Sequence, residues 1–266
     1  MAKEVQVAFV GDIALNEDRT PHGSKVSPGG AAYYSMVGAS FFTPEVGIVA
    51  KIGQDFDTEL LERRNIDTAG VRQTEGDTCR FILTQYTDNT RDFSAERGVA
   101  EEVDTSIFPE QYWKAPYIHL PTQLPEHALH WLSFLEGHGN VSADPFEAFV
   151  REYPDLTRLM LEKADFIFIN EEEYALLRAT TSSLADKPVV LKKGPKGAMY
   201  MSPEETYTFP APKVKALETT GAGDVLAGAF LAQLANGLSI PLALENAIAI
   251  ASISVTQFGV EHIPAK

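Results

Sequence analysis

Apolar and polar residues follow one another along this chain in blocks that predict alternating strands and helices. Short apolar runs rich in Val, Ile and Phe, bounded by Gly, Pro or Asp, are typical of buried strands. Longer segments with helical spacing follow most of them, which predicts a mostly parallel sheet covered on both faces. The strands are expected at Val5–Val10, Val46–Ile52, Tyr117–Leu120, Asn140–Ala143, Phe166–Ile169 and Val189–Leu191. The helices are expected at Ala31–Ala39, Asp57–Arg64, Glu126–Glu136, Leu156–Lys163 and Glu172–Arg178, and two further apolar helices close the chain.

Two pairs of segments fit antiparallel hairpins instead. Cys79–Tyr86 and Arg91–Ala95 flank a polar turn, and Ala198–Met201 precedes a similar strand at Glu205–Phe209. Turn residues are also expected at Ser27–Gly30. No repeat, low-complexity tract or linker interrupts the pattern, so residues 1–266 are expected to form a single α/β domain.

Charge and cysteine content narrow the classes of function. The 266 residues carry a formal net charge of −15, which makes binding to nucleic acid or to an anionic membrane a poor expectation. Cys79 is the single cysteine, so an intramolecular disulfide and a thiolate metal cluster are excluded. The N-terminal residues lack the apolar run of a signal peptide, and polar residues interrupt the apolar region Val225–Val255. A cytoplasmic location is therefore expected.

The most informative polar residues follow predicted strands or open a helix. Asp12, Asp144 and Asn170 each come at the end of a strand, and functional groups in parallel sheets gather at that edge. The segment Glu218–Asp224 leads directly into an apolar helix. Unpaired N–H groups at a helix N-terminus bind anions, and small residues let a phosphate approach them. Asp224 could then accept a proton from an attacking hydroxyl, although an aspartate after a glycine turn is more commonly a helix cap.

The segment Thr219–Asp224, placed before a helix of small residues, resembles the signature of the PfkB (ribokinase-like) carbohydrate kinase family. Other features of that family occur in the expected order over nearly the whole chain. They are Gly11, the pair Gly29–Gly30, the pattern Asn170-x-x-Glu173, the segment Lys192–Gly197 and the helix Ala247–Gly259. The resemblance implies a ribokinase-like three-layer α/β/α sandwich with a small β lid, and an ATP-dependent kinase that uses Mg²⁺.

The resemblance also implies roles for individual residues. Asp224 would be the general base, Gly221, Ala222 and Gly223 the anion hole, and Glu173 the residue that organises Mg²⁺. The substrate would contact Asp12, Asn16, Gly29, Gly30, Tyr34 and Gln123. The nucleotide would contact Asn170, Lys192, Gly194, Gly197, Thr219 and Asn246. His127 and His130 are expected to have surface or packing roles.

Three departures from the family pattern bear on the substrate. Glu218 stands where the family usually has Asp, Asn16 where related sequences often have Asp, and Tyr34 where sugar kinases have Asn. The segment between Gly11 and Gly29 leaves little room for a full lid, so a lid built from about 12–28 and 78–97 would come mostly from its second part. This compact layout resembles that of myo-inositol kinases.

The resemblance therefore implies phosphorylation of a sugar or a cyclitol. Two alternatives stay open: a nucleoside kinase, because Tyr34 could stack on a base, and a non-catalytic small-molecule sensor, which the retained Asp224 argues against. A dimer could cover the site through the lid. One of Arg80, Arg91 and Arg97 could meet an anionic substituent of the substrate. A dinucleotide oxidoreductase is not expected, since Gly11–Ala14 lacks the required glycine pattern.

Overall fold

A nine-stranded sheet forms the centre of the computed structural model, which describes residues 4–20, 23–86, 91–181 and 183–266. Its order is β13-β12-β11-β10-β9-β8-β1-β4-β5, parallel from β11 to β5 and antiparallel at β12 and β13. The predicted mostly parallel sheet is confirmed. Its strands are β1 (Val7–Val10), β4 (Val46–Ile52), β5 (Asp67–Gln73), β8 (Tyr117–Leu120), β9 (Val141–Ala143), β10 (Phe166–Asn170), β11 (Val189–Lys192), β12 (Ala198–Met201) and β13 (Thr206–Phe209).

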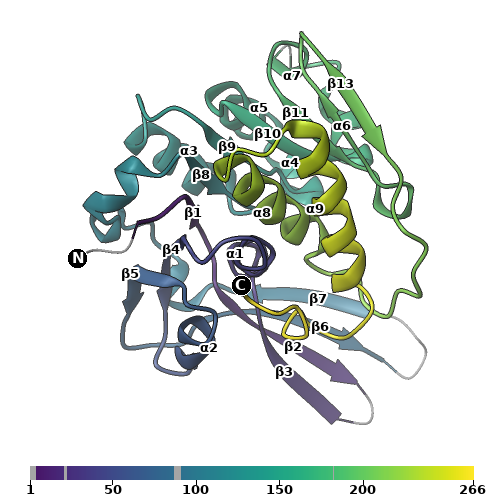
Figure 1. Ribbon diagram of the computed structural model, residues 1–266. Coiled ribbons are helices and arrows are strands. Elements are labelled where there is room, and N and C mark those ends of the chain that lie inside the picture. The colour runs from purple at the N-terminus through teal and green to yellow at the C-terminus, as the bar shows by residue number, and fades with distance from the viewer. Residues whose placement is uncertain (1–3, 21–22, 87–90, 182) are drawn as a thin grey trace.

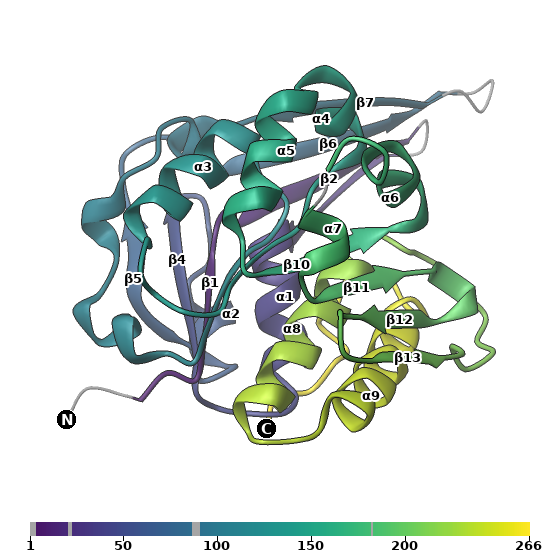
Figure 2. The same ribbon diagram turned by 90° about the horizontal axis from the view of Figure 1, so that it is seen from above.

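Helices cover both faces of this sheet (Figures 1 and 2). Successive residues of its inner strands point to opposite faces, so each strand contributes to two separate buried clusters. In β1, Phe9 belongs to one buried apolar cluster and Ala8 to the other. The first face carries α1 (Ala31–Ser40), α8 (Ala222–Ala235) and α9 (Ile240–Ser254). The second carries α3 (Pro125–Phe134), α4 (Glu147–Glu152), α5 (Pro154–Lys163), α6 (Glu171–Leu177) and α7 (Ser183–Asp186), while α2 (Glu59–Glu62) follows β4. Among the described residues, none of these helices is long and apolar enough to cross a membrane.

Helices α1 and α8 touch through their backbones. A side chain at Gly38 would overlap the carbonyl oxygen of Val225, and one at Gly228 would overlap the carbonyl oxygen of Ser35. Glycine is therefore required on each helix at this crossing. The contact holds the N-terminal ends of α1 and α8, which both reach the functional edge of the sheet, in a fixed relation.

A separate four-stranded sheet, here called the lid, projects beside the carboxyl end of β1 (Figure 1). Its order is β3 (Gly23–Gly29), β2 (Ala14–Thr20), β6 (Cys79–Gln85) and β7 (Arg91–Glu96). The expectation that residues 12–28 leave little room for lid strands is wrong, since two seven-residue strands lie there. Ser27–Gly29 continues β3 where a turn was expected, because its residues pair with β2 up to Gly29.

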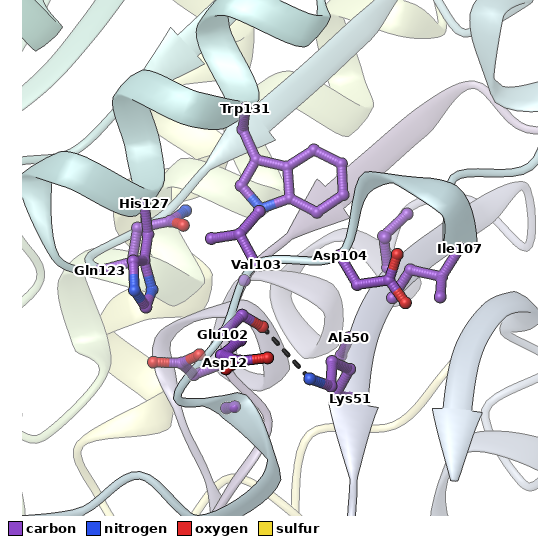
Figure 3. A pocket seen from close by; sticks show the side chains of 13 residues that line it. Asp12, Ala50, Lys51, Glu102, Val103, Asp104, Ile107, Gln123, His127 and Trp131 are labelled. Atoms are coloured by element: carbon purple, nitrogen blue, oxygen red, sulfur yellow. Dashed lines mark hydrogen bonds between the residues drawn. The ribbon is translucent and has the colours of Figure 1, made fainter. Parts of the chain in front are cut away.

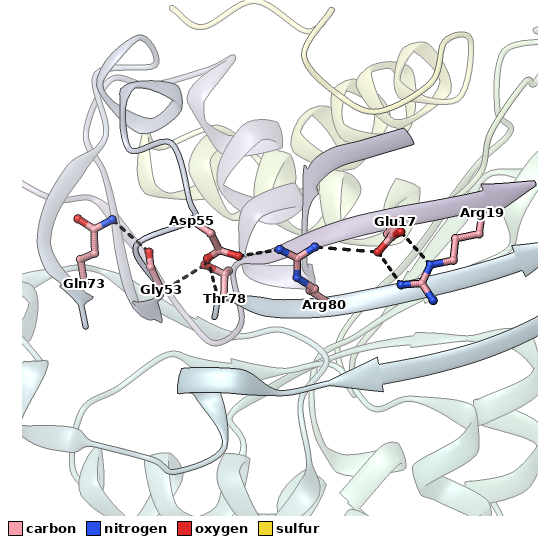
Figure 4. Close-up of polar contacts among 7 residues, drawn as sticks. All are labelled: Glu17, Arg19, Gly53, Asp55, Gln73, Thr78 and Arg80. Carbon is pink, nitrogen blue, oxygen red and sulfur yellow. Dashed lines mark hydrogen bonds and ion pairs between the residues drawn. The ribbon is translucent and has the colours of Figure 1, made fainter. Parts of the chain in front are cut away.

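A chain of polar contacts ties the lid to the loop after β4 (Figure 4). Asp55 accepts hydrogen bonds from the backbone N–H and hydroxyl of Thr78 and pairs with Arg80 of β6 at 2.8 Å. Arg80 also faces Glu17 of β2 at 4.0 Å, and Glu17 pairs with Arg19. Both halves of the lid are thus anchored at one point of the central domain.

Candidate active site

The carboxyl ends of four parallel strands carry polar side chains at one edge of the sheet. Asp12 follows β1, Asp144 follows β9, Asn170 ends β10 and Lys192 ends β11, in register with Asn170. The N-terminus of α8 lies against the same edge, because Gly223 contacts the Lys192 side chain. The topology therefore builds one site from residues far apart in the sequence.

The first turn of α8, called here the anion turn (Gly221–Gly223), is shaped to admit a ligand. Gly221 has φ 74°, and a Cβ on it would overlap the ring of Tyr34. Within the described residues no side chain caps the helix, so apart from the N–H of Ala222, which donates to Thr219 O, the N–H groups of this turn are available to an anion. The N-cap is Gly221 and Asp224 lies three residues inside, so the alternative that Asp224 is the cap is wrong.

Asp224 has the electrostatics of a proton acceptor. Burial raises its pKa from 3.8 to about 8, repulsion by Asp144 and Glu173 adds to this, and Lys192 opposes it. Once ionised, a carboxylate with this pKa is a stronger base than an ordinary aspartate, so it can take a proton from a hydroxyl and release it to water afterwards. No hydrogen bond to this carboxylate is found among the described residues, so it is free to meet a substrate.

A buried ion pair lies next to Asp224. The ammonium of Lys192 donates to Oδ2 of Asp144, whose side chain is 1% exposed. A Cβ on Gly223 would lie 3.2 Å from Lys192 Nζ, so the ammonium also borders the anion turn. The sequence placed Asp144 at this edge but gave it no role. The available signal was an aspartate directly after a buried strand, as with Asp12.

Asn170 and Glu173 form a capping box at the start of α6. Asn170 Oδ1 accepts from the N–H groups of Glu172 and Glu173 at 2.9 Å, and Glu173 Oε2 accepts from the N–H of Asn170 at 2.9 Å. Glu173 is nonetheless 3% exposed, and burial raises its pKa to about 7, with Lys192 opposing the rise and Asp144 adding to it. The capping box fixes Glu173 beside Asp144 and Lys192.

The carboxylates near Glu173 fit a magnesium ion that keeps most of its water. Asp144 Oδ1 is buried without a hydrogen-bond partner in the described part of the chain, so one carboxylate oxygen remains as a possible metal ligand. No group of three or more His, Cys, Asp or Glu within the described residues could enclose a metal. Mg²⁺ commonly binds through one or two carboxylates together with water and phosphate oxygens, so this donor set suits it.

The substrate residues expected on the lid side are also close together. A Cβ on Gly29 would overlap the Asn16 side chain, and one on Gly30, at φ 92°, would overlap the backbone carbonyl of Asp12. Asn16 Nδ2 donates to Tyr34 Oη at 2.7 Å, while Asn16 Oδ1 is buried without a partner among the described residues. That oxygen can accept a hydroxyl proton from a ligand.

Asp12 and Gln123 border a hollow that is open to solvent (Figure 3). Burial raises the pKa of Asp12 to about 6, although Arg97 Nη1 lies 3.5 Å from its Oδ2 and opposes the rise. Gln123 Nε2 donates to Val10 O at 3.0 Å, which fixes its side chain against the end of β1. The hollow is lined further by Lys51, Glu102, Asp104, His127 and Trp131. His127, expected to be a surface or packing residue, faces this hollow.

The remaining expected nucleotide residues lie around α9 and the end of β11. Gly194 and Gly197 bound the turn η4 (Gly194–Lys196), and both have positive φ. Thr219 accepts through its carbonyl from the N–H of Ala222. Asn246 donates to Gln233 at 2.7 Å and so links α9 to α8.

Exposed apolar side chains flank the end of α9. Leu217 donates from its backbone to Val255 O, and Glu218 accepts from the N–H of Gly259 at 2.9 Å. These contacts hold residues 217–218 along the helix end, where several large apolar side chains face solvent. They are Val214, Leu217, Ile253 and Phe258.

Comparison with known proteins agrees with this geometry. Residues 6–266 match the family model described as pfkB family carbohydrate kinase. The cytidine kinase of Thermococcus kodakarensis is 30% identical, over 88% of this chain and 90% of its own length. The ATP-dependent ribose-1-phosphate kinase of Halopiger xanaduensis is 28% identical, over 95% and 91% respectively.

A solved structure shows the same fold. The putative ribokinase II of E. coli, in complex with ATP and Mg²⁺, superposes with a TM-score of 0.83 at 21% identity, covering 98% of this chain and 96% of that one. Sequence and fold therefore agree: the chain belongs to the pfkB family of carbohydrate kinases and is a phosphotransferase with a hydroxyl acceptor.

Proposed function

We propose that this protein transfers the γ-phosphate of ATP to a hydroxyl of a sugar or sugar-like polyol. The observation that carries the proposal is Asp224, a carboxylate with raised pKa directly beside the uncapped anion turn of α8. A base next to an anion site is the arrangement that phosphoryl transfer needs. The acceptor hydroxyl loses a proton while negative charge develops on the phosphoryl group.

The reaction follows from the positions of these groups. Asp224 accepts the proton of the acceptor hydroxyl, and the hydroxyl oxygen forms a bond to the γ-phosphorus. The bond between that phosphorus and the bridging oxygen of ADP breaks, and ADP leaves with the electron pair. The N–H groups of the anion turn and the Lys192 ammonium stabilise the negative charge of the phosphoryl oxygens.

Glu173 would hold Mg²⁺ through water, with Asn170 fixing the orientation of Glu173 through the capping box. When bound, the ion offsets repulsion between the ATP phosphates and the carboxylates of the site. The apolar side chains beside the end of α9 would cover the adenine, and Gly194 and Gly197 would let the loop after β11 approach the nucleotide.

The acceptor would lie between Asp224 and the lid. Asn16 Oδ1 and the backbone around Gly29 and Gly30 offer hydrogen bonds to vicinal hydroxyls, which suits a sugar or a cyclitol. A nucleoside is the second candidate. One relative is a cytidine kinase, and the hollow beside Asp12 and Gln123 opens to solvent, so part of a larger acceptor would extend into it.

A homodimer through the lid is part of the proposal. Leu83 and Phe93 lie opposite each other on β6 and β7, on one face of the lid, and are 37% and 62% exposed. A second copy that covered them would remove apolar surface from water. Sedimentation velocity would report a dimer that Phe93→Ser weakens, and a monomer at every accessible concentration would contradict it.

The test of function is an ATP-consumption screen with Mg²⁺. The acceptors are myo-inositol and other cyclitols, ribose, fructose, 2-keto-3-deoxygluconate and a nucleoside panel, with Asp224→Asn as the blank. Turnover of one class that disappears in the variant supports the proposal and identifies the acceptor class. Bound ATP without turnover on any acceptor would favour a non-catalytic sensor instead.

A further inference from the structure

The ion pair between Asp144 and Lys192 joins the ends of two strands that are not neighbours in the sheet. Asp144 follows β9 and Lys192 ends β11, with β10 lying between these strands. The two side chains therefore meet across the end of β10. Lys192 is 14% exposed and Asp144 is 1% exposed, so the pair is largely removed from water.

Two contacts fix the orientation of the Lys192 side chain. Asp144 Oδ2 accepts a hydrogen bond from its ammonium, and Gly223 lies against the last carbons and nitrogen of its side chain. A Cβ at position 223 would lie 3.1 Å from Lys192 Cδ, which is tighter than ordinary packing. Within the described residues, Asp144 is the only hydrogen-bond acceptor found for this ammonium, so two of its three protons remain for a ligand at the anion turn.

The pairing also keeps Lys192 charged. Burial by itself lowers the pKa of a lysine, but attraction to Asp144, and then to Glu173 and Asp224, raises it here. Asp144 Oδ1 has no partner among the described residues. A buried ion pair with one unsatisfied oxygen adds little to stability, because desolvation offsets the attraction. A role in stability alone therefore does not explain this buried ion pair.

We propose that Asp144 is a positioning residue, which acts through Lys192 by holding its ammonium beside the anion turn to bind the phosphoryl group that is transferred. This inference rests on the proposed function. It predicts that Asp144 affects binding of the terminal phosphate of ATP and not of the rest of the nucleotide.

Calorimetric titration with MgATP and with MgADP, without acceptor, isolates that effect. The quantity measured is the ratio of the ATP affinity to the ADP affinity. We expect Asp144→Asn and Lys192→Met to lower this ratio about 10- to 100-fold, the scale of a charge-assisted hydrogen bond. Asp144→Glu, which restores the carboxylate, should lie between Asp144→Asn and the wild type.

Two further variants separate positioning from structure. The double variant Asp144→Asn with Lys192→Met should have the ratio of Lys192→Met alone, because Asp144 acts through the lysine. Lys187→Met is the matched control. Lys187 precedes the same strand, β11, at its opposite end and donates to backbone carbonyls of α5 and of Ala164, so its loss should lower stability and leave the ratio unchanged.

The outcomes distinguish this inference from the kinase proposal. Equal loss of ATP and ADP affinity in Asp144→Asn, or an unchanged ratio, would overturn the positioning role while leaving a kinase. A wild type that binds neither nucleotide would overturn the proposed function and this inference with it. If Asp144→Asn does not fold, Asp144→Ser replaces it, with the same expected fall in the ratio.

Discussion

Replacing Asp224 by Asn should lower turnover by orders of magnitude and stabilise the fold. The substitution keeps the shape of the side chain and removes a negative charge that burial, Asp144 and Glu173 all disfavour. As general base, Asp224 should contribute about 10²- to 10⁴-fold to kcat. Because no hydrogen bond to its carboxylate is found among the described residues, the amide leaves no previously satisfied group without a partner.

The size of the stabilisation follows from the pKa. Between pH 3.8 and about 8, the carboxyl of Asp224 is protonated in the folded state and ionised in the unfolded state. The unfolded state then binds fewer protons, so the wild type loses stability as pH rises through this window, whereas Asp224→Asn does not. One pKa unit corresponds to about 1.4 kcal/mol, so the advantage of the variant is up to roughly 5 kcal/mol near pH 8.

Chemical denaturation of both proteins at intervals from pH 4 to pH 9 would measure this difference, alongside ADP release at pH 8. The advantage should be near zero at pH 4, grow with pH and level off above pH 8. Asp155→Asn is the matched control, because Asp155 is an exposed aspartate in the first turn of α5. It should leave activity intact and change stability by under about 1 kcal/mol. An Asp224→Asn variant that turns over within tenfold of the wild type, or that is less stable at pH 8, would refute the reasoning.

Three further substitutions test the rest of the site. Glu173→Gln keeps a capping side chain but loses a charge that burial disfavours, so the Mg²⁺ concentration for half-maximal rate should rise about 10- to 100-fold while the unfolding free energy does not fall at neutral pH; an unchanged Mg²⁺ dependence would count against a metal role. Tyr34→Phe removes the hydroxyl that accepts from Asn16 and should raise KM for the acceptor about 5-fold, with KM for ATP unchanged; equal effects on both would indicate general distortion. Gly221→Ala forces a side chain onto the Tyr34 ring at φ 74°, so thermal unfolding should show a loss of about 2 kcal/mol or more, and a neutral result would mean that the turn is not held as described.

The sequence predicted those parts of the fold whose residues are buried on both faces. The apolar runs at Val46–Ile52 and Val189–Leu191 became inner strands because such runs have few other stable positions. By contrast, β5 is an edge strand with the sequence DTAGVRQ, and its polar residues gave no strand pattern. The lid strands β2 and β3 were missed for a similar reason, since much of the lid is open to solvent and needs no regular alternation.

The residues of the site also differ in how far the local sequence could predict them. Local features located Asp224, because small residues before an apolar helix describe a helix N-terminus without any knowledge of the fold. The partnership of Asp144 with Lys192 could not be found locally. The two residues are 48 positions apart, and their contact depends on β9 and β11 lying on either side of β10.

The glycine crossing of α1 and α8 has a consequence for how such an enzyme can change its substrate. Gly38 and Gly228 fix the backbone of one helix against the other, so the acceptor end of α1 and the phosphate end of α8 cannot drift apart. The lid meets α1 near its start, through Gly29 and Asn16, and is tied to the loop after β4 by Asp55 and Arg80. Residues that recognise the acceptor can therefore be exchanged on the lid while the alignment of donor and acceptor atoms is inherited unchanged. Directed evolution of a new specificity should accordingly collect its mutations in 14–29 and 79–97 and spare the helix crossing.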